Sequence, residues 1–155
     1  MAGKTGNMEF NELIADFAAR HGVDDLIAAD NAAALDIDGI IVIIVSKDDT
    51  LTISAEIGEP PAEGAAAFAN VLLEANLQSD SFFAKAAETD RYVIVRRLAL
   101  PSLDAMAFDN AIEGIVNQAE AWHKMLEDFR PAAKAAAEMA EAERPAFGSS
   151  DFVQV

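Results

Sequence analysis

The longest amphipathic pattern in the sequence runs through residues 100–129. Its apolar side chains alternate between spacings of four and three residues, which places them along one face of a helix: Phe108, Ile112, Ile115, Ala119, Trp122, Leu126 and Phe129. Ser102 is expected to cap this helix, and Pro131 to end it because proline has no amide hydrogen to donate. The stripe predicts a helix buried against a sheet. A coiled coil is the alternative, but it requires three or four sustained heptads.

Two shorter segments have the same helical period. The first begins after Asn7, a predicted cap, and ends at Gly22; its apolar positions are Phe10, Leu13, Ile14, Phe17 and Ala18. The second follows Pro61 and ends near Asn76, a predicted left-handed cap; its apolar positions are Ala65, Phe68, Val71, Leu72 and Ala75.

The remaining patterned segments indicate strands. Residues 24–31 are predicted to be a connector, and Leu35 and Ile37 then alternate with Asp36 and Asp38. Residues 40–45 are apolar throughout, which predicts a strand covered on both faces or paired at an interface.

Three more strands follow. Residues 51–57 alternate between apolar and polar side chains, and residues 82–87 and 92–98 resemble a hairpin. The predicted fold class is therefore α+β, in the order helix-strand-strand-strand-helix-strand-strand-helix, with an antiparallel sheet packed against the helices.

Length and composition predict one domain. We expect a flexible N-terminus over residues 1–8, a single domain over residues 9–130, and a C-terminal tail over residues 131–155 that is Ala-rich and then disordered. No apolar run is long enough to span a bilayer, and the first residues do not resemble a secretory signal.

The excess of acidic residues limits the kinds of partner that we expect. The sequence has 11 Lys and Arg against 27 Asp and Glu, a formal net charge of −16. Such a field repels nucleic acid and anionic membranes, so neither nucleic-acid binding nor membrane insertion is expected. The absence of cysteine excludes disulfides, thiol catalysis and Cys-based zinc sites.

Few residues suggest catalysis or cofactor binding. His21 and His123 are expected to be structural, and Asp36 with Asp38 are more typical of a solvated strand face than of a cation site. No phosphate-binding glycine motif occurs. The basic residues Arg91, Arg96 and Arg97 are expected to pair with acids of the same chain. We therefore predict no enzyme activity and no cofactor.

Two sequence passages and one helix pattern resemble a known family. They are Phe-Ala-Asn-Val-Leu-Leu-Glu-Ala-Asn at residues 68–76, Leu-Ala-Leu-Pro-Ser-Leu at residues 98–103, and the helix carrying Ile112, Val116, Ala119 and Trp122. Together with the order of elements, they resemble the class I type III secretion chaperones, with their Tir-chaperone-like fold, from about residue 9 to residue 129.

The resemblance implies a cytoplasmic homodimer that uses neither nucleotide nor metal. It implies that the protein binds the N-terminal segment of a secreted effector and keeps that segment soluble and ready for export. The alternative is an adaptor or regulatory protein-binding domain of the same fold with no secreted client. A cation-dependent hydrolase using Asp36 and Asp38 is a third hypothesis.

The resemblance also assigns surfaces. The dimer interface would lie on the second helix and the following strand, at Phe68, Val71, Leu72, Phe82 and Phe83. The client-binding surface would lie on the first helix and the sheet, at Leu13, Phe17, Ile41, Ile43 and Ile53. For both sets, the alternative is that the side chains fill the core of one protomer.

Overall fold

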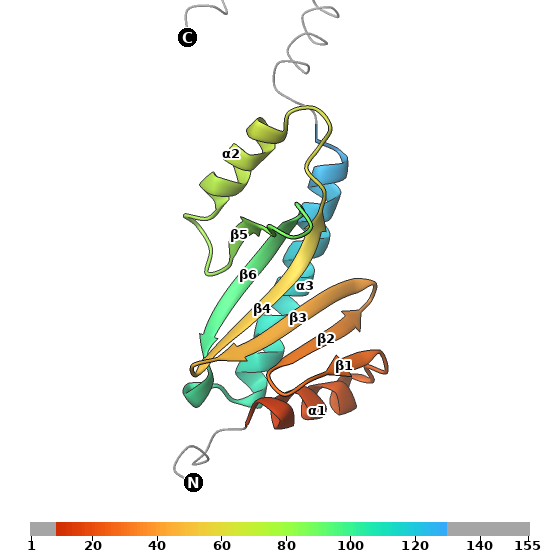
Figure 1. Ribbon diagram of the computed structural model, residues 1–155, viewed down its shortest axis with the longest axis vertical. Coiled ribbons are helices and arrows are strands. Elements are labelled where there is room, and N and C mark those ends of the chain that lie inside the picture. Colours follow the sequence, from red (N-terminus) through yellow and green to blue (C-terminus); the bar gives the residue numbers. More distant parts are fainter. Residues whose placement is uncertain (1–8, 130–155) are drawn as a thin grey trace, which may run out of the picture.

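The computed structural model describes residues 9–129, and these residues form three α-helices and a six-stranded antiparallel sheet (Figure 1). The elements in chain order are α1 (Phe10–His21), β1 (Leu26–Ala28), β2 (Ala32–Ile37), β3 (Ile40–Lys47), β4 (Thr50–Gly58), α2 (Ala65–Ala75), β5 (Phe82–Lys85), β6 (Tyr92–Ala99), a 3-10 turn (Leu100–Ser102) and α3 (Ala105–Glu127). The strands lie in the order β1-β2-β3-β4-β6-β5. The predicted α+β class and order of elements are confirmed.

The short strand β1 differs from the prediction. It lies within residues 24–31, which were predicted to be a connector, and it pairs with β2 from Leu26 opposite Leu35 to Ala28 opposite Ala33. A strand of three residues is too short to show an alternating pattern, so only the pairing reveals it. The predicted terminal segments, residues 1–8 and 131–155, lie outside the described residues.

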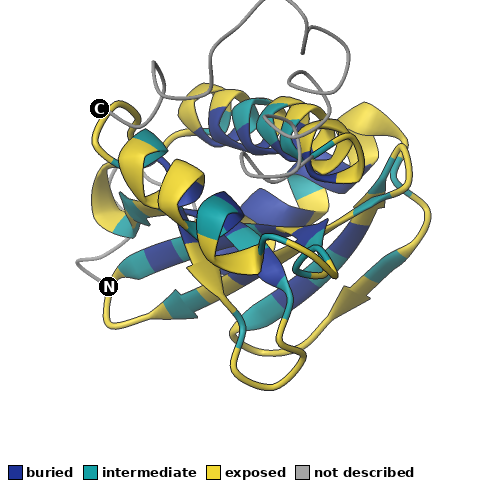
Figure 2. Cartoon of the chain, turned by 90° about the horizontal axis from the view of Figure 1, so that it is seen from above, coloured by how far each residue is buried: buried dark blue, intermediate teal, exposed yellow. Residues whose placement is uncertain are grey.

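The core lies between the sheet and α3, which runs behind the strands in Figure 1. Buried residues (dark blue in Figure 2) are concentrated where helices and strands face one another. The largest fully buried sheet residues are Leu35, Ile44, Leu51, Ile53, Ile57 and Ile94, and α3 contributes Phe108, Ile112 and Ile115. The apolar stripe of the long helix is therefore the wall of the core, as predicted, from Phe108 to Leu126.

The prediction that residues 40–45 form a strand covered on both faces is wrong. Val42 and Ile44 are fully buried toward α3, whereas Ile41, Ile43 and Val45 are exposed by 47%, 46% and 39%. Successive side chains of a strand point to opposite faces, and α3 covers only one of them. The other prediction for this strand, that it pairs at an interface, remains open.

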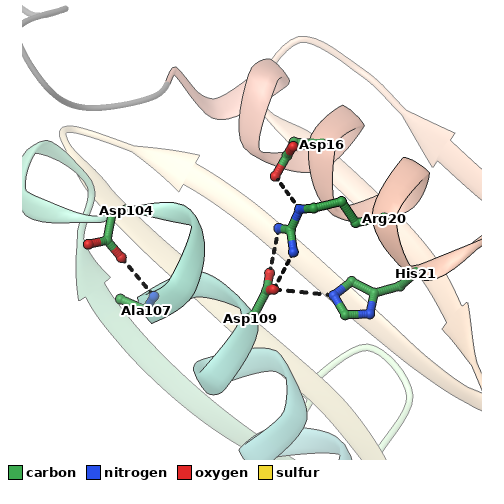
Figure 3. A network of polar contacts seen from close by, with 6 residues as sticks. All are labelled: Asp16, Arg20, His21, Asp104, Ala107 and Asp109. Carbon is green, nitrogen blue, oxygen red and sulfur yellow. Dashed lines mark hydrogen bonds and ion pairs between the residues drawn. The ribbon is translucent and has the colours of Figure 1, made fainter.

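The start of α3 also differs from the prediction. Asp104, rather than Ser102, caps it: one Asp104 carboxylate oxygen accepts the Ala107 amide hydrogen at 2.8 Å (Figure 3). The Ser102 hydroxyl instead donates to the Ala99 carbonyl within the 3-10 turn. Serine and aspartate can both cap a helix. Ser102 belongs to the 3-10 turn that precedes α3, so Asp104 is the residue at the start of the α-helix.

The caps predicted for the other two helices agree with the structure only in part. Gly22 has the predicted left-handed conformation at the end of α1, but the cap at its start is Glu9, and Asn7 lies outside the described residues. The backbone of Asn76 is right-handed rather than left-handed, and its side chain binds the backbone of β5. Its Oδ1 accepts the Phe83 amide hydrogen at 2.7 Å, and its amide group donates to the Phe83 carbonyl at 3.4 Å. These bonds join the end of α2 to β5.

Within residues 9–129, no helix combines the length and apolar character that crossing a bilayer requires.

Candidate functional site

The sheet face opposite α3 carries a groove of about 800 Å³. In Figure 1 this face is turned toward the viewer, and no helix among residues 9–129 lies across its strands. The groove is lined mainly by β3, β4, β5, β6 and the turn between β5 and β6. A groove of this size on a sheet face that no described helix covers is the first candidate for a binding site.

Strand register brings apolar side chains together in this groove. Ile43 pairs with Ser54, Ser54 with Val95, and Val95 with Phe82, so these four residues form one row across the open face. Val93 lies two residues from Val95 on β6 and therefore on the same face. Ile41 also lines the groove, at its outer side. The result is an apolar floor with small hydroxyl groups.

The groove has a charged group toward each end. At one end, Arg97 pairs in register with Thr52, and its guanidinium carbon lies 5.2 Å from the centre of the Phe82 ring. At the other end, Arg91 forms ion pairs with Glu56 and, at 3.4 Å, with Glu59. The hydrogen bond to Glu56 raises the pKa of Arg91 above its usual value. The prediction of acid partners therefore holds for Arg91, whereas neither Arg96 nor Arg97 has an acid partner among residues 9–129.

The predicted client-binding residues separate into two groups. Ile41 and Ile43 line the groove. Leu13 and Phe17 are buried on α1, where the Phe17 ring meets the edge of Phe108 at 5.6 Å between ring centres. Ile53 is fully buried because it lies on the α3 side of β4. Those three side chains are core residues, so a client cannot contact them in this structure.

The predicted dimer residues separate in the same way. Phe68, Leu72 and Phe83 are core residues, and the Phe83 ring packs against Trp122 at 4.8 Å between ring centres. Val71 is exposed on α2. Phe82 is partly buried and lines the groove rather than the core.

The sequence reasoning missed several surface residues. Val93, Val95 and Arg97 line the groove. Their spacing of two residues, which places them on one face of a strand, is the sequence signal that could have found them. Near α2, Leu73 and Leu77 are exposed by 63% and 89% and interrupt the helical period. A second, apolar hollow of about 340 Å³ lies between α2 and β5, lined by Ala65, Ala66, Ala69, Leu72, Leu73, Phe83, Ala84, Lys85 and Tyr92.

The residues considered for catalysis have structural roles. His21 and Arg20, at the end of α1, both contact Asp109 of α3, and Arg20 also binds Asp16 (Figure 3). The hydrogen bond from Arg20 lowers the pKa of Asp109. His123 Nδ1 lies 2.7 Å from the Ile57 carbonyl oxygen, which can only accept, so this nitrogen carries the proton.

The two aspartates considered for a cation are not neighbours on a strand. Asp36 is the last residue but one of β2, and its carboxylate accepts the Gly39 amide hydrogen at 2.9 Å, whereas Asp38 lies in the turn with a positive φ of 52°. Within residues 9–129, no three His, Asp or Glu side chains are grouped so that they could hold a metal ion.

One family model matches most of the described chain. The model of the Tir chaperone protein (CesT) family matches residues 12–123. The chain belongs to the Tir chaperone protein family. The resemblance found in the sequence is therefore confirmed. Among curated protein sequences, none matches this CesT-family chain significantly.

Several solved structures share the CesT-family fold. A chain of the ExsC-ExsE complex has a TM-score of 0.65 and 20% identity to this protein, covering 81% of this chain and 99% of that one. The Yersinia pestis type III secretion chaperone SycH, in complex with a stable fragment of YscM2, has a TM-score of 0.59 and 16% identity, covering 74% and 99%. The Escherichia coli protein YbjN, titled a putative transcription regulator, has a TM-score of 0.57 and 16% identity, covering 76% and 91%. At these identities the likeness establishes the fold.

Proposed function

We propose that this CesT-family protein is a cytoplasmic, homodimeric chaperone for a type III secreted effector. It binds the N-terminal segment of the effector and keeps that segment soluble and ready for export, with no cofactor and no catalysed reaction. The observation that supports the proposal best is the apolar groove on the open face of the sheet.

The groove suits an extended, unfolded segment. Its side chains Ile41, Ile43 and Val93 offer apolar contacts, and each client anchor buried there contributes about 1.5–3 kcal/mol. Four such anchors offset the roughly 2–5 kcal/mol that ordering a disordered segment costs. Affinity of this size permits both protection and release.

The edge of the sheet offers a second mode of contact. Among residues 9–129, β1 pairs only with β2, so its outer backbone groups are not used by the described sheet, and Ile27 is among the most exposed apolar residues. An extended client segment can add to such an edge through main-chain hydrogen bonds. The groove and the edge together would hold a longer segment than either alone.

The proposed dimer contact is the outer surface of α2. Val71 and Leu73 are exposed on α2, and Leu77 is exposed in the turn that follows it; Leu73 also lines the apolar hollow between α2 and β5. This keeps the predicted contact on the second helix and the following strand, but assigns it to the exposed side chains instead of Phe68, Leu72 and Phe83.

Co-purification tests the client assignment. N-terminal fragments of the effectors encoded in the same genome would be co-expressed with the chain, and one of them should co-purify with the wild type. Ile43→Asp places a charge on the groove floor and should reduce recovery about tenfold or more, because a desolvated, unpaired charge is costly. Met106→Asp, at an exposed apolar residue outside the groove, should leave recovery unchanged. Equal recovery with both variants would refute the groove assignment.

The adaptor or regulatory alternative has the same fold, as the likeness to YbjN illustrates. It predicts that the co-purifying partner is a resident protein and that no effector fragment is retained. The same experiment, with the partner identified by mass spectrometry, decides between the two functions.

A further inference from the structure

Within residues 9–129, Arg97 has no acidic partner, although the protein is strongly acidic. The chain carries 27 acidic residues, and Arg20, Lys85 and Arg91 each bind at least one of them. Arg97 is exposed in the groove without a carboxylate partner among residues 9–129. The surroundings of Arg97 are instead Thr52, its partner in register, and the Phe82 ring.

We infer that Arg97 selects client segments that carry a carboxylate beside their apolar anchors. The inference rests on the proposed function of the groove and adds the chemistry of its partner. A guanidinium binds a carboxylate through two parallel hydrogen bonds, and contact with the Phe82 ring restricts the Arg97 side chain before the client arrives. The contact is therefore partly organised in advance.

The charge distribution along the groove gives the client a direction. Arg97 pairs with Thr52, the next row contains Val95 and Ser54, and the third contains Val93 and Glu56. Residues two apart on a strand share a face and lie about 6.7 Å apart. An extended segment that runs along β6 would thus place an acidic side chain at Arg97 and an apolar side chain two positions away, over Val95.

The opposite end of the groove disfavours a second acid. Glu56 and Glu59 share the single cation of Arg91 there, and Glu88 also lines the groove at this end. A client that is acidic throughout would be repelled by these groups and by the net charge of −16. The selected segment therefore has one carboxylate at a fixed position within an otherwise apolar or basic sequence.

Peptide selection measures this preference without knowledge of the client. Random 12-residue peptides displayed on phage would be selected separately on the wild type, on Arg97→Glu and on Lys47→Glu. Lys47 is exposed at the end of β3, outside the groove, so its substitution makes the same change in net charge elsewhere. Circular dichroism should be native for both variants, because both side chains are exposed.

The expected result is a reversal of charge at one peptide position. Wild type and Lys47→Glu should enrich Asp or Glu two positions from an apolar residue, and Arg97→Glu should enrich Lys or Arg there. For a selected peptide measured by fluorescence anisotropy, Asp→Lys at that position should weaken binding to the wild type about tenfold and strengthen binding to Arg97→Glu.

Failure of the inference about Arg97 and failure of the groove assignment give different results. The same peptide composition on wild type and Arg97→Glu, with Ile43→Asp abolishing binding, would overturn the role of Arg97 and leave the groove as the client site. Retention of no peptide by the wild type, or retention that Ile43→Asp does not change, would overturn the groove assignment as well. If the Arg97→Glu substitution lowers the mass of the protein in solution, a second copy of the chain, not a client, occupies the groove.

Discussion

At the scale of single residues, Asp109 carries a charge that joins two helices. Its carboxylate binds Arg20 and His21 of α1, and the hydrogen bond from Arg20 lowers its pKa. Since the pKa is lower in the folded state, this stabilisation is present above about pH 4, the unfolded value, and is lost as the pH falls through the folded value. We expect Asp109→Asn to lower the melting temperature by roughly 1–3 °C at pH 7 and by less near pH 3.

Thermal melts between pH 3 and pH 8 measure this difference. Asp30→Asn is the control, because Asp30 is exposed in a loop. A destabilisation by Asp109→Asn that does not change with pH would contradict the ion pair as its cause.

Gly58 allows β4 to approach α3 closely. Its φ is +150°, and a Cβ atom built there would lie 3.0 Å from Leu126 Cδ2. We expect Gly58→Ala to cost about 1–3 kcal/mol of unfolding free energy in urea titrations, because backbone strain and a crowded core contact add. Gly39→Ala has a positive φ of +87° but no atom within 4 Å of the added Cβ, so it measures strain alone. Equal losses for both variants would show that contact with Leu126 contributes nothing.

At the residue scale, the sequence predicted which apolar side chains belong to each strand better than it predicted which of them are buried. Ile41 and Ile43 were predicted on the client surface and are exposed in the groove, whereas Ile53, predicted with them, is fully buried. The three residues are chemically identical and differ only in which face of the sheet they occupy. The alternation of residues 51–57 indicates that Ile53 lies on the apolar face of its strand. The uniformly apolar run of residues 40–45 gives no such signal for Ile41 and Ile43, and there the position of α3 determines which face is buried.

At the scale of elements, Asn76 joins the end of α2 to β5. The two hydrogen bonds between its side chain and the Phe83 backbone are partly buried. Asn76→Ala should destabilise the protein by about 1–2 kcal/mol, because it leaves the Phe83 amide without its partner. Hydrogen exchange of the Phe83 amide should accelerate at the same time. Asn76→Asp retains the acceptor oxygen and should protect this amide better than Asn76→Ala; equal exchange in the two variants would argue against the bond.

The elements themselves could be predicted where the pattern was long. The helical periods predicted the existence of α1, α2 and α3, because each buries one face in the core, but they did not give the start of α3. Prediction failed where two local signals competed or none existed: Ser102 and Asp104 are both good caps, and β1 has only three residues. The uniform apolar run in β3 was misleading because its exposed face belongs to the groove. Of these errors, only the one in β3 concerns residues that line the groove.

At the scale of the whole molecule, helices cover one face of the sheet and leave two apolar surfaces exposed. One is the groove on the open face of the sheet, and the other is the outer surface of α2. Exposed apolar patches on a soluble protein often mark interaction sites. Two separate surfaces permit a client and a second copy of the chain to bind together, which a single shared surface would not.

The α2 surface makes a testable prediction about mass. The wild type should sediment at about twice the chain mass of 16.5 kDa at micromolar concentration. Leu73→Asp should give a folded monomer, because this side chain is 63% exposed in one chain and would bury an unpaired charge at the interface, a cost of roughly 3–5 kcal/mol. Phe83→Asp would not distinguish the two roles, since Phe83 packs in the core. Met106→Asp should remain dimeric, and a monomeric wild type, or a dimeric Leu73→Asp, would contradict the α2 interface.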